Sequence, residues 1–188
     1  MLRDTRGPAL DEALAYLDKA AARGDAVANG ALATVYQFGI GRPVDVPRAI
    51  AYTRVAAEGG VPFAMMDLGA RLLAGAGVQR DPAQGLAWTR RAADAGYPDA
   101  LAQYGLMQLN GLDGVAKNVP AGAAMIERAA NAGSVPGMTL LAKLYYEGIG
   151  KPRDLAMSAR WFKRAAEGGD AEAAEAILEP ELAAALRK

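Results

Sequence analysis

The stretch GIGKPRDLAMSARWFKRAAEGG, residues 148–169, contains the pattern that decides the fold. It joins a Gly-x-Gly element, an aspartate, a tryptophan and a double alanine that is followed by glycine. The double alanine recurs along the chain. Its copies begin at Ala20, Ala56, Ala92, Ala129 and Ala165, which are 36, 36, 37 and 36 residues apart. A period of this length is typical of solenoids that are built from helix pairs.

The Gly-x-Gly element recurs as well, and this decides between two interpretations of Gly148–Lys151. A Gly-x-Gly-Lys run before a helix can cradle a phosphate, but such a loop occurs once and continues with Ser or Thr after the lysine. Here Pro152 follows the lysine, and similar elements begin at Gly39, Gly75 and Gly111. The element is therefore predicted to be a structural turn.

Each period is predicted to hold two helices. In the first, as in the segment that starts at Ala64, apolar or small residues recur at the spacing of one helical face. The second follows a capping side chain and ends at a glycine beside the double alanine, where a positive φ costs little. The expected caps of the second helices are Asp45, Asp81, Asn118 and Asp154.

The sequence thus predicts an all-α fold, an α/α superhelical solenoid of about four full helix-pair repeats with terminal half-repeats. We expect a single repeat domain over residues 1–188. Its expected parts are a half-repeat at 8–24, repeats at about 25–60, 61–96, 97–133 and 134–169, and C-terminal capping helices at 170–188. The first half-repeat lacks its first helix, so it is either a cap or the remainder of a trimmed chain.

Composition limits the chemistry that the chain can perform. Lys plus Arg and Asp plus Glu number 21 each, so a formal net charge of zero gives little attraction for nucleic acid. Without His or Cys, the commonest transition-metal ligands and the usual general base are missing. The two serines, Ser134 and Ser158, lie in no nucleophile motif. We expect no enzyme activity, no catalytic residue, no metal site and no cofactor.

Apolar runs in the chain are short. None approaches the roughly 20 residues that a membrane-spanning helix needs, and the N-terminal stretch lacks the apolar core of a signal peptide. We expect a soluble protein in either the cytoplasm or the periplasm, and a monomer is favoured over an oligomer.

The combined pattern resembles the Sel1-like repeat, a relative of the tetratricopeptide repeat with its own Gly-x-Gly turn. The resemblance covers about Ala9 to Leu178, with departures at Gln108 and Met125 and one inserted residue in the third turn. The second repeat carries the pattern most completely, at Ala64, Leu68, Gly69, Leu72, Gly75, Gly77, Val78, Asp81, Gly85, Trp88, Ala92, Ala93 and Gly96.

The resemblance implies a non-enzymatic adaptor or scaffold that binds other proteins. It implies two alternatives, a toxin-immunity or inhibitor protein of a bacterial secretion system and a β-lactam-related hydrolase. The second alternative belongs to a cysteine-rich branch, and the absence of cysteine disfavours it.

The first helices are predicted to line a concave groove. Leu32, Leu68, Tyr104 and Leu141 are predicted to fall on the buried face, so the opposite, unusually apolar stripe should face the groove. Two interpretations remain open. Either curvature buries this stripe against neighbouring repeats, or the stripe binds a partner protein or peptide. The predicted partner-binding residues are Phe38, Phe63, Met66, Leu73, Leu106, Leu109, Asn110, Lys143, Tyr146 and Glu147.

Overall fold

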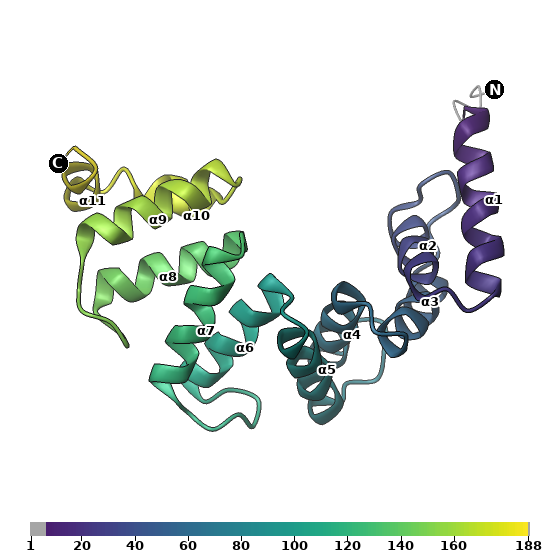
Figure 1. Ribbon diagram of the computed structural model, residues 1–188, viewed down its shortest axis with the longest axis horizontal. Coiled ribbons are helices and arrows are strands. Elements are labelled where there is room, and N and C mark those ends of the chain that lie inside the picture. Colours follow the sequence, from purple (N-terminus) through teal and green to yellow (C-terminus); the bar gives the residue numbers. More distant parts are fainter. Residues whose placement is uncertain (1–6, 188) are drawn as a thin grey trace. The chain divides into compact units, whose positions relative to one another are not determined.

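The computed structural model describes residues 7–187, which form helices and turns without a strand (Figure 1). The helices are α1 (Pro8–Ala22), α2 (Ala26–Phe38), α3 (Val46–Glu58), α4 (Pro62–Ala74), α5 (Pro82–Asp94), α6 (Pro98–Asn110), α7 (Val119–Asn131), α8 (Val135–Glu147), α9 (Leu155–Glu167), α10 (Ala171–Ala176) and α11 (Pro180–Ala185). The predicted all-α solenoid of helix pairs is confirmed. In each pair an even-numbered helix from α2 to α8 is the first, and the next helix is the second.

Local capping chemistry fixes where the second helices begin. The side chain of Asp45 accepts a hydrogen bond from the Arg48 N–H at 3.0 Å, and Asp81 accepts from the Gln84 N–H at the same distance. Asn118 and Asp154 cap α7 and α9 in the same way. All four caps lie where the sequence predicts them, because a side-chain acceptor satisfies an N–H that has no partner within the helix.

The second glycine of three of the four turns, Gly41, Gly77 and Gly150, allows a close packing contact, whereas a Cβ on Gly114 would meet nothing within 4 Å. Gly77 has a φ of +74°, and a Cβ built there would lie 2.7 Å from Cδ1 of Ile50. A Cβ on Gly150 would lie 2.8 Å from the Cβ of Ala123. These three turns therefore rest on the second helix of the preceding repeat, which supports their interpretation as structural elements.

The chain separates into two compact units, which are named unit 1 (residues 1–91) and unit 2 (residues 92–188). In unit 1, α2 packs against α1 and α3, and α3 packs against α4. A Cβ on Gly69 would lie 2.7 Å from Oγ1 of Thr89, so α4 and α5 also approach closely. That all 188 residues act as one domain stays a prediction.

In unit 2, α6 to α9 form a continuous packing series, and both α10 and α11 pack against α9. Its core contains Ile126, Leu141, Trp161, Phe162 and Leu182, each less than a tenth exposed. Leu182 comes from α11, so the C-terminal helix buries an apolar side chain at the end of the series, as a cap does.

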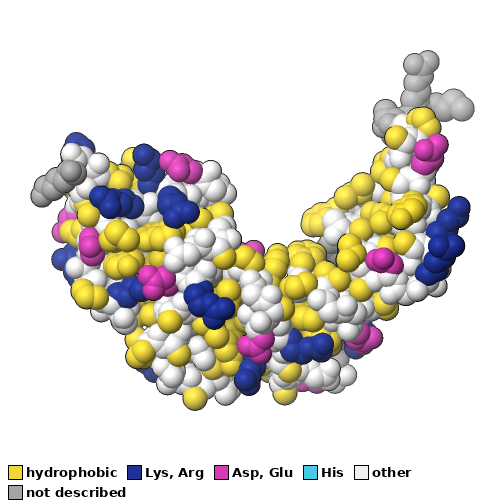
Figure 2. Space-filling model, viewed as in Figure 1, with side chains coloured by type: hydrophobic (Ala, Val, Ile, Leu, Met, Phe, Trp, Pro, Cys, Tyr) yellow, Lys and Arg dark blue, Asp and Glu magenta, His cyan; other side chains and the backbone are white. Residues whose placement is uncertain are grey.

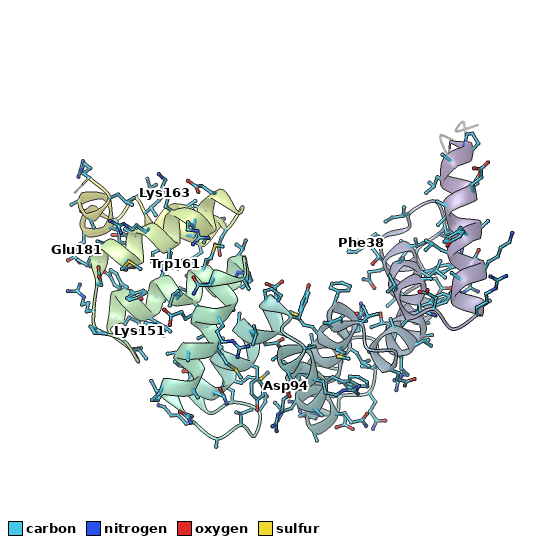
Figure 3. All side chains as sticks on the ribbon, in the orientation of Figure 1. Phe38, Asp94, Lys151, Trp161, Lys163 and Glu181 are labelled. Carbon is cyan, nitrogen blue, oxygen red and sulfur yellow. The ribbon has the colours of Figure 1, made fainter. Side chains whose placement is uncertain are left out.

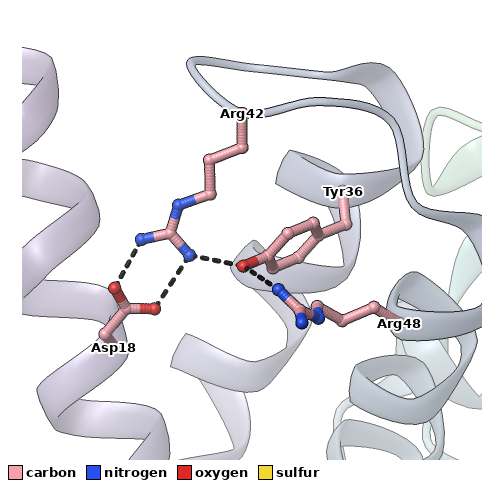
Figure 4. Close-up of polar contacts among 4 residues, drawn as sticks. All are labelled: Asp18, Tyr36, Arg42 and Arg48. Atoms are coloured by element: carbon pink, nitrogen blue, oxygen red, sulfur yellow. Dashed lines mark hydrogen bonds and ion pairs between the residues drawn. The ribbon is translucent and has the colours of Figure 1, made fainter.

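The half-repeat α1 is held to the rest of unit 1 by a polar network (Figure 4). Arg42, in the turn between α2 and α3, forms a bidentate ion pair with Asp18 of α1. The same guanidinium donates to the Tyr36 hydroxyl at 2.8 Å, and Arg48 donates to that hydroxyl at 3.0 Å. The hydrogen bonds from Arg42 lower the pKa of Asp18.

The helices of both units are short. Within residues 7–187, none of them combines the length and the apolar character that crossing a bilayer requires.

Candidate functional site

The predicted partner-binding residues divide between the two units. Phe38, Phe63, Met66 and Leu73 belong to α2 and α4 of unit 1, and the other six belong to α6 and α8 of unit 2. Their role in binding stays a prediction.

In unit 1 the first helices enclose a pocket of about 160 Å³. It lies between α2 and α4, and Thr53 of α3 also lines it. The lining residues are Ala33, Thr34, Gln37, Phe38, Thr53, Phe63, Asp67 and Arg71. The pocket thus brings together two of the predicted residues, Phe38 and Phe63, which are 25 positions apart in the sequence.

Hydrogen bonds between three helices organise the polar part of this pocket. Arg71 donates through Nε to Asp67 at 2.8 Å and through Nη2 to Oε1 of Gln37 at 2.9 Å. The buried Thr53 lies 3.3 Å from the same Asp67 carboxylate, to which its hydroxyl donates. The side chain of Arg71 is only 14% exposed. The network fixes the position of α2 relative to α4 and neutralises the two charges.

Two aromatic rings form the apolar rim. Phe38 is 71% exposed and Phe63 is 51% exposed, which is unusual for such large apolar side chains. Figure 3 shows Phe38 projecting outward from α2, whereas Trp161 lies among the helices of unit 2. In Figure 2, hydrophobic side chains gather on the visible surface of unit 1 over α2 and α4. Met66 is half-buried on the same helix as Phe63.

The structure places Leu73 and Leu109 against second helices. Cγ of Leu73 lies 2.8 Å from the position that a Cβ on Gly85 of α5 would take, and the backbone N of Leu109 lies 2.7 Å from that position on Gly122 of α7. Leu109 is buried in the core of unit 2. Leu73 and Leu109 each follow a glycine of the same helix, Gly69 or Gly105, by four residues. They therefore lie on the side of the helix that faces the second helix. At these two leucines the stripe that was predicted to face the groove packs against second helices instead.

In unit 2 the predicted polar residues already have partners within the chain. Lys143 forms an ion pair with Glu172 of α10 at 2.6 Å. The guanidinium of Arg153 lies over the ring of Tyr146, 5.7 Å from its centroid, and also bonds Glu181 of α11 at 3.2 Å. The C-terminal helices therefore engage much of this surface.

The remaining predicted residues lie at the ends of first helices. Leu106 packs partly buried against the core of unit 2. Asn110 is exposed, and its side-chain amide donates to the Leu106 carbonyl at 3.3 Å. Glu147 is exposed at the last position of α8.

Sequence reasoning missed Asp67, Arg71 and Thr53. The signal for the first two was present, because an acid and a base four residues apart on a helix commonly pair. It also missed a second hollow in unit 1, of about 260 Å³. That hollow is lined by Arg54, Leu72, Val78, Gln79, Arg80, Asp81 and Gln84. Its wall is mostly charged or polar, and the backbone N–H of Gln84 lowers the pKa of Asp81.

The unit 1 pocket combines a paired acid and base with apolar side chains. Asp67 and Arg71 are its ionisable residues, and they are paired with each other. In residues 7–187, acidic side chains do not gather in groups of three that could hold a metal ion. The pocket offers aromatic rings, methyl groups and the amide nitrogen of Gln37, which suit an apolar group next to a hydrogen-bond acceptor.

The sequence matches a known repeat family. The Sel1 repeat pattern matches residues 8–25, 26–61, 62–97, 98–134 and 135–170. No curated protein matches the chain.

Several solved structures are similar. A Sel1 repeat protein from Oxalobacter formigenes is 34% identical with a TM-score of 0.74, and the match covers 86% of this chain and 66% of that one. The protective antigen c5321 of uropathogenic Escherichia coli is 31% identical with a TM-score of 0.71, over 87% of this chain and 35% of that one. The chain therefore spans less than two thirds of either relative.

The immunity protein Pa5087 from Pseudomonas aeruginosa is 24% identical with a TM-score of 0.59, over 91% of this chain and 62% of that one, which shows the shared fold alone. The five repeat matches cover most of the sequence, so the chain belongs to the Sel1 repeat family.

Proposed function

We propose that this protein is a non-enzymatic interaction module, an adaptor or scaffold, that binds a partner protein or peptide through the first helices of unit 1. Sel1 repeat proteins are generally protein-interaction modules. The observation that carries the proposal is the pocket between Phe38 and Phe63, where two large apolar rings are exposed beside an ordered polar network. Exposed aromatic side chains around a hollow are common anchors of protein interfaces.

The size of the pocket favours a peptide over a free small molecule. Pockets that enclose drug-sized ligands usually measure about 300–1,000 Å³. A volume of about 160 Å³ holds one apolar side chain of a peptide or of a docked helix. Phe38 and Phe63 would contact that side chain, and the amide nitrogen of Gln37 would donate to a neighbouring carbonyl of the partner.

The polar network of Asp67, Arg71 and Gln37 supports peptide binding because it preorganises the pocket. Arg71 is held by Asp67 and Gln37, so the charged group already has partners and is not left unpaired when a ligand excludes water. The helices that carry the rings are fixed by the same bonds, which lowers the entropy cost of binding.

The test is selection of a displayed random-peptide library on the whole chain. Enriched peptides are then titrated against the wild type and against the double variant Phe38→Asp, Phe63→Asp. We expect the double variant to lose at least about tenfold in affinity, because two carboxylates would replace the apolar rim. The control is Leu178→Asp, at a leucine of unit 2 that is 76% exposed. It should bind like the wild type.

Both aspartates replace exposed side chains, so the circular dichroism spectrum and the melting temperature should stay near those of the wild type. Equal binding by the wild type and the double variant would sink the proposal. Loss of binding in Leu178→Asp alone would place the peptide on unit 2 instead.

An immunity or inhibitor role would be one form of the same binding activity, with a toxin as the partner. The pocket fits such a partner no better than another protein. A β-lactam-related hydrolase finds no support in the pocket residues, which offer no nucleophile beside a base.

A further inference from the structure

The turn that joins α6 to α7 differs from the other Gly-x-Gly turns of the chain (Figure 1). It contains one extra residue, so that Asp113 stands directly before the second glycine, Gly114. Asp113 has a φ of +51°, and among residues 7–187 it is the one residue other than glycine with a positive φ. This region is uncommon for residues with a Cβ, although aspartate adopts it more readily than most.

Both residues of this Asp-Gly pair are open to solvent. Asp113 and Gly114 are exposed, and a Cβ built on Gly114 would meet no atom within 4 Å. Within residues 7–187, the Asp113 carboxylate makes no hydrogen bond or ion pair, and the Gly114 N–H donates to no acceptor. The side-chain carboxyl carbon and the backbone nitrogen that follows it are therefore both accessible and not held by other groups.

These two groups can react with each other. When the Gly114 nitrogen attacks Cγ of the protonated Asp113 carboxyl, a new N–Cγ bond closes a succinimide ring. The nitrogen loses its hydrogen and the carboxyl loses its hydroxyl, and together they leave as water. Water then adds to either carbonyl carbon and reopens the ring. When it adds to the main-chain carbonyl carbon of Asp113, the original peptide bond breaks and the chain continues through the side chain as isoaspartate.

Two Asn-Gly pairs in the same chain provide an internal comparison. Asparagine before glycine forms the same succinimide faster than aspartate does in unstructured peptides, with ammonia as the leaving group. In Asn29–Gly30 the fold opposes this reaction. Asn29 is 3% exposed, and its side-chain amide donates to the Asp25 carbonyl at 2.7 Å. The Gly30 N–H lies inside α2, where backbone N–H groups bond to the carbonyl four residues earlier.

Asn110–Gly111 is the closer comparison, because Asn110 is exposed like Asp113 and lies three positions before it. Here the attacking nitrogen is engaged. The Gly111 N–H donates to the Met107 carbonyl at 2.8 Å, in the bond that ends α6. The side-chain amide of Asn110 also donates to the Leu106 carbonyl at 3.3 Å. Two exposed pairs in one turn thus differ in whether the glycine N–H has an acceptor.

We propose that Asp113–Gly114 is a site of spontaneous aspartate isomerisation, at which a succinimide forms and reopens to isoaspartate. The reaction needs no co-reactant besides water, which is released in the first step and taken up in the second. Glycine favours the ring closure, because a residue without a Cβ leaves its nitrogen sterically open to the side chain before it. The product carries a free α-carboxyl group, which makes it a substrate for a methyltransferase that uses S-adenosylmethionine to methylate isoaspartate.

Isomerisation changes the turn but not the helices around it. Isoaspartate adds a methylene group to the backbone at position 113. The Val115 N–H donates to the Leu112 carbonyl at 2.9 Å across this position, so that bond cannot keep its geometry. The cap of α7 lies beyond the turn, where Asn118 accepts from the Ala121 N–H at 3.1 Å. We therefore expect the aged chain to stay folded, with faster amide exchange at Val115 and unchanged exchange at Ala121.

The experiment ages the full chain at body temperature and neutral pH over several weeks. Trypsin then releases Ala92–Lys117 as one peptide, which contains both Asp113 and Asn110. Electron-transfer fragmentation locates isoaspartate in this peptide, and a rise in mass reports deamidation of Asn110. In the folded chain we expect isoaspartate at Asp113 to accumulate at least about tenfold faster than Asn110 deamidates, because helix bonds protect the Gly111 N–H.

Two controls accompany the aged wild type. Asp113→Glu keeps the charge at an exposed position but cannot form a succinimide, so it should give no isoaspartate at position 113. The isoaspartate methyltransferase with labelled S-adenosylmethionine should accordingly label the aged wild type and leave this variant near its unaged level. Ageing the wild type in guanidinium chloride releases the helix bonds of both Asn-Gly pairs, and they should then react ahead of Asp113.

A folded chain in which Asp113 remains ordinary aspartate after ageing overturns the proposal. So does a folded chain in which Asn110 deamidates faster than Asp113 isomerises, because the hydrogen bond of the glycine N–H would then not be the deciding feature. Neither result bears on the pocket of unit 1, which the peptide titration tests independently.

Discussion

The hydroxyl of Thr139 in α8 donates a hydrogen bond of 2.5 Å to the carboxylate of Asp170, which caps the start of α10. Ser134, the cap of α8, donates to Asp99 of α6 at 2.6 Å in a similar way. Consecutive first helices of unit 2 are thus tied together at their N-terminal ends. Such bonds join elements about one repeat apart in the sequence, and a helix cap becomes part of the contact between repeats.

The Thr139–Asp170 bond predicts a pH-dependent contribution to stability. The hydrogen bond from Thr139 is the largest influence on Asp170, followed by the Ala173 N–H, and it lowers the pKa of that carboxyl below its ordinary value. A lowered pKa in the folded state means that the contribution is present above the unfolded value of about 4 and is lost as the pH falls below it. Thr139→Val should therefore reduce the free energy of unfolding by about 1 kcal/mol at pH 7.

Urea unfolding at pH 7 and at pH 3 measures this difference. The gap between the wild type and Thr139→Val should narrow between pH 7 and pH 3, because the lowered pKa of Asp170 stabilises the folded state less as the pH falls below the ordinary carboxyl value. A residual gap is expected, because Thr139 also donates to the Val135 carbonyl at 3.3 Å. A gap of the same size at both pH values would show that the carboxylate charge contributes nothing.

A second prediction concerns the attachment of α1. Arg42 bonds both Asp18 and Tyr36, whereas Arg48 bonds Tyr36 without reaching α1. Arg42→Ala should therefore speed amide hydrogen exchange in α1 by about tenfold, since it removes a partly exposed two-point ion pair. Arg48→Ala is the control and should leave exchange in α1 unchanged. Equal acceleration in both variants would mean that the Tyr36 hydroxyl, and not Asp18, governs the attachment.

Helical glycines give a third prediction, with opposite signs at two positions. A Cβ on Gly122 would lie 2.6 Å from the Gly105 carbonyl oxygen and 2.7 Å from the Leu109 backbone nitrogen, and neither backbone atom can move aside cheaply. Gly122→Ala should cost about 1–3 kcal/mol. A Cβ on Gly30 would meet only the Ala56 Cβ at 3.7 Å and the Val61 Cγ1 at 3.8 Å. Gly30→Ala should stabilise α2 by about 0.5–1 kcal/mol through helix propensity.

Chemical denaturation of both variants tests this pair, since alanine has the same intrinsic helix preference at either site. If Gly122→Ala were as stable as Gly30→Ala, the close approach of α6 and α7 would not be rigid. Small residues at the helix contacts would then have no steric reason to be there.

The repeat period predicted the helix pairs because capping and turn chemistry are local. Asp154 and the glycine at 169 mark the ends of α9 from the sequence alone, since a side-chain acceptor and a positive φ act within a few residues. The candidate site was harder to predict. Phe38 and Phe63 were identified as exposed apolar residues of first helices, and they do line a common pocket.

Leu109 shows why the rest of the site did not follow from the pattern. A helical stripe drawn from spacing alone does not show how closely two axes approach, and this distance is set by Gly105 and Gly122 on facing helices. At that approach, Leu109 is 8% exposed. Lys143 illustrates the second reason, because its partner Glu172 comes from α10, which carries no pattern that links it to α8.

The last prediction uses Gln108, the departure from the repeat pattern in α6. The corresponding positions hold Tyr36, Leu72 and Tyr145, and among residues 7–187 the buried Oε1 of Gln108 has no hydrogen-bond donor within reach. A buried carbonyl without a partner costs about 1–3 kcal/mol, and leucine has a similar size without the polar atom. Gln108→Leu should raise the urea midpoint of unfolding with an unchanged m-value, which corresponds to about 1 kcal/mol of added stability. Gln108→Glu should lower the midpoint, since a carboxylate there is costlier to bury. A lower midpoint for Gln108→Leu would mean that the amide makes a stabilising contact, and the third repeat would then owe part of its stability to its departure from the pattern.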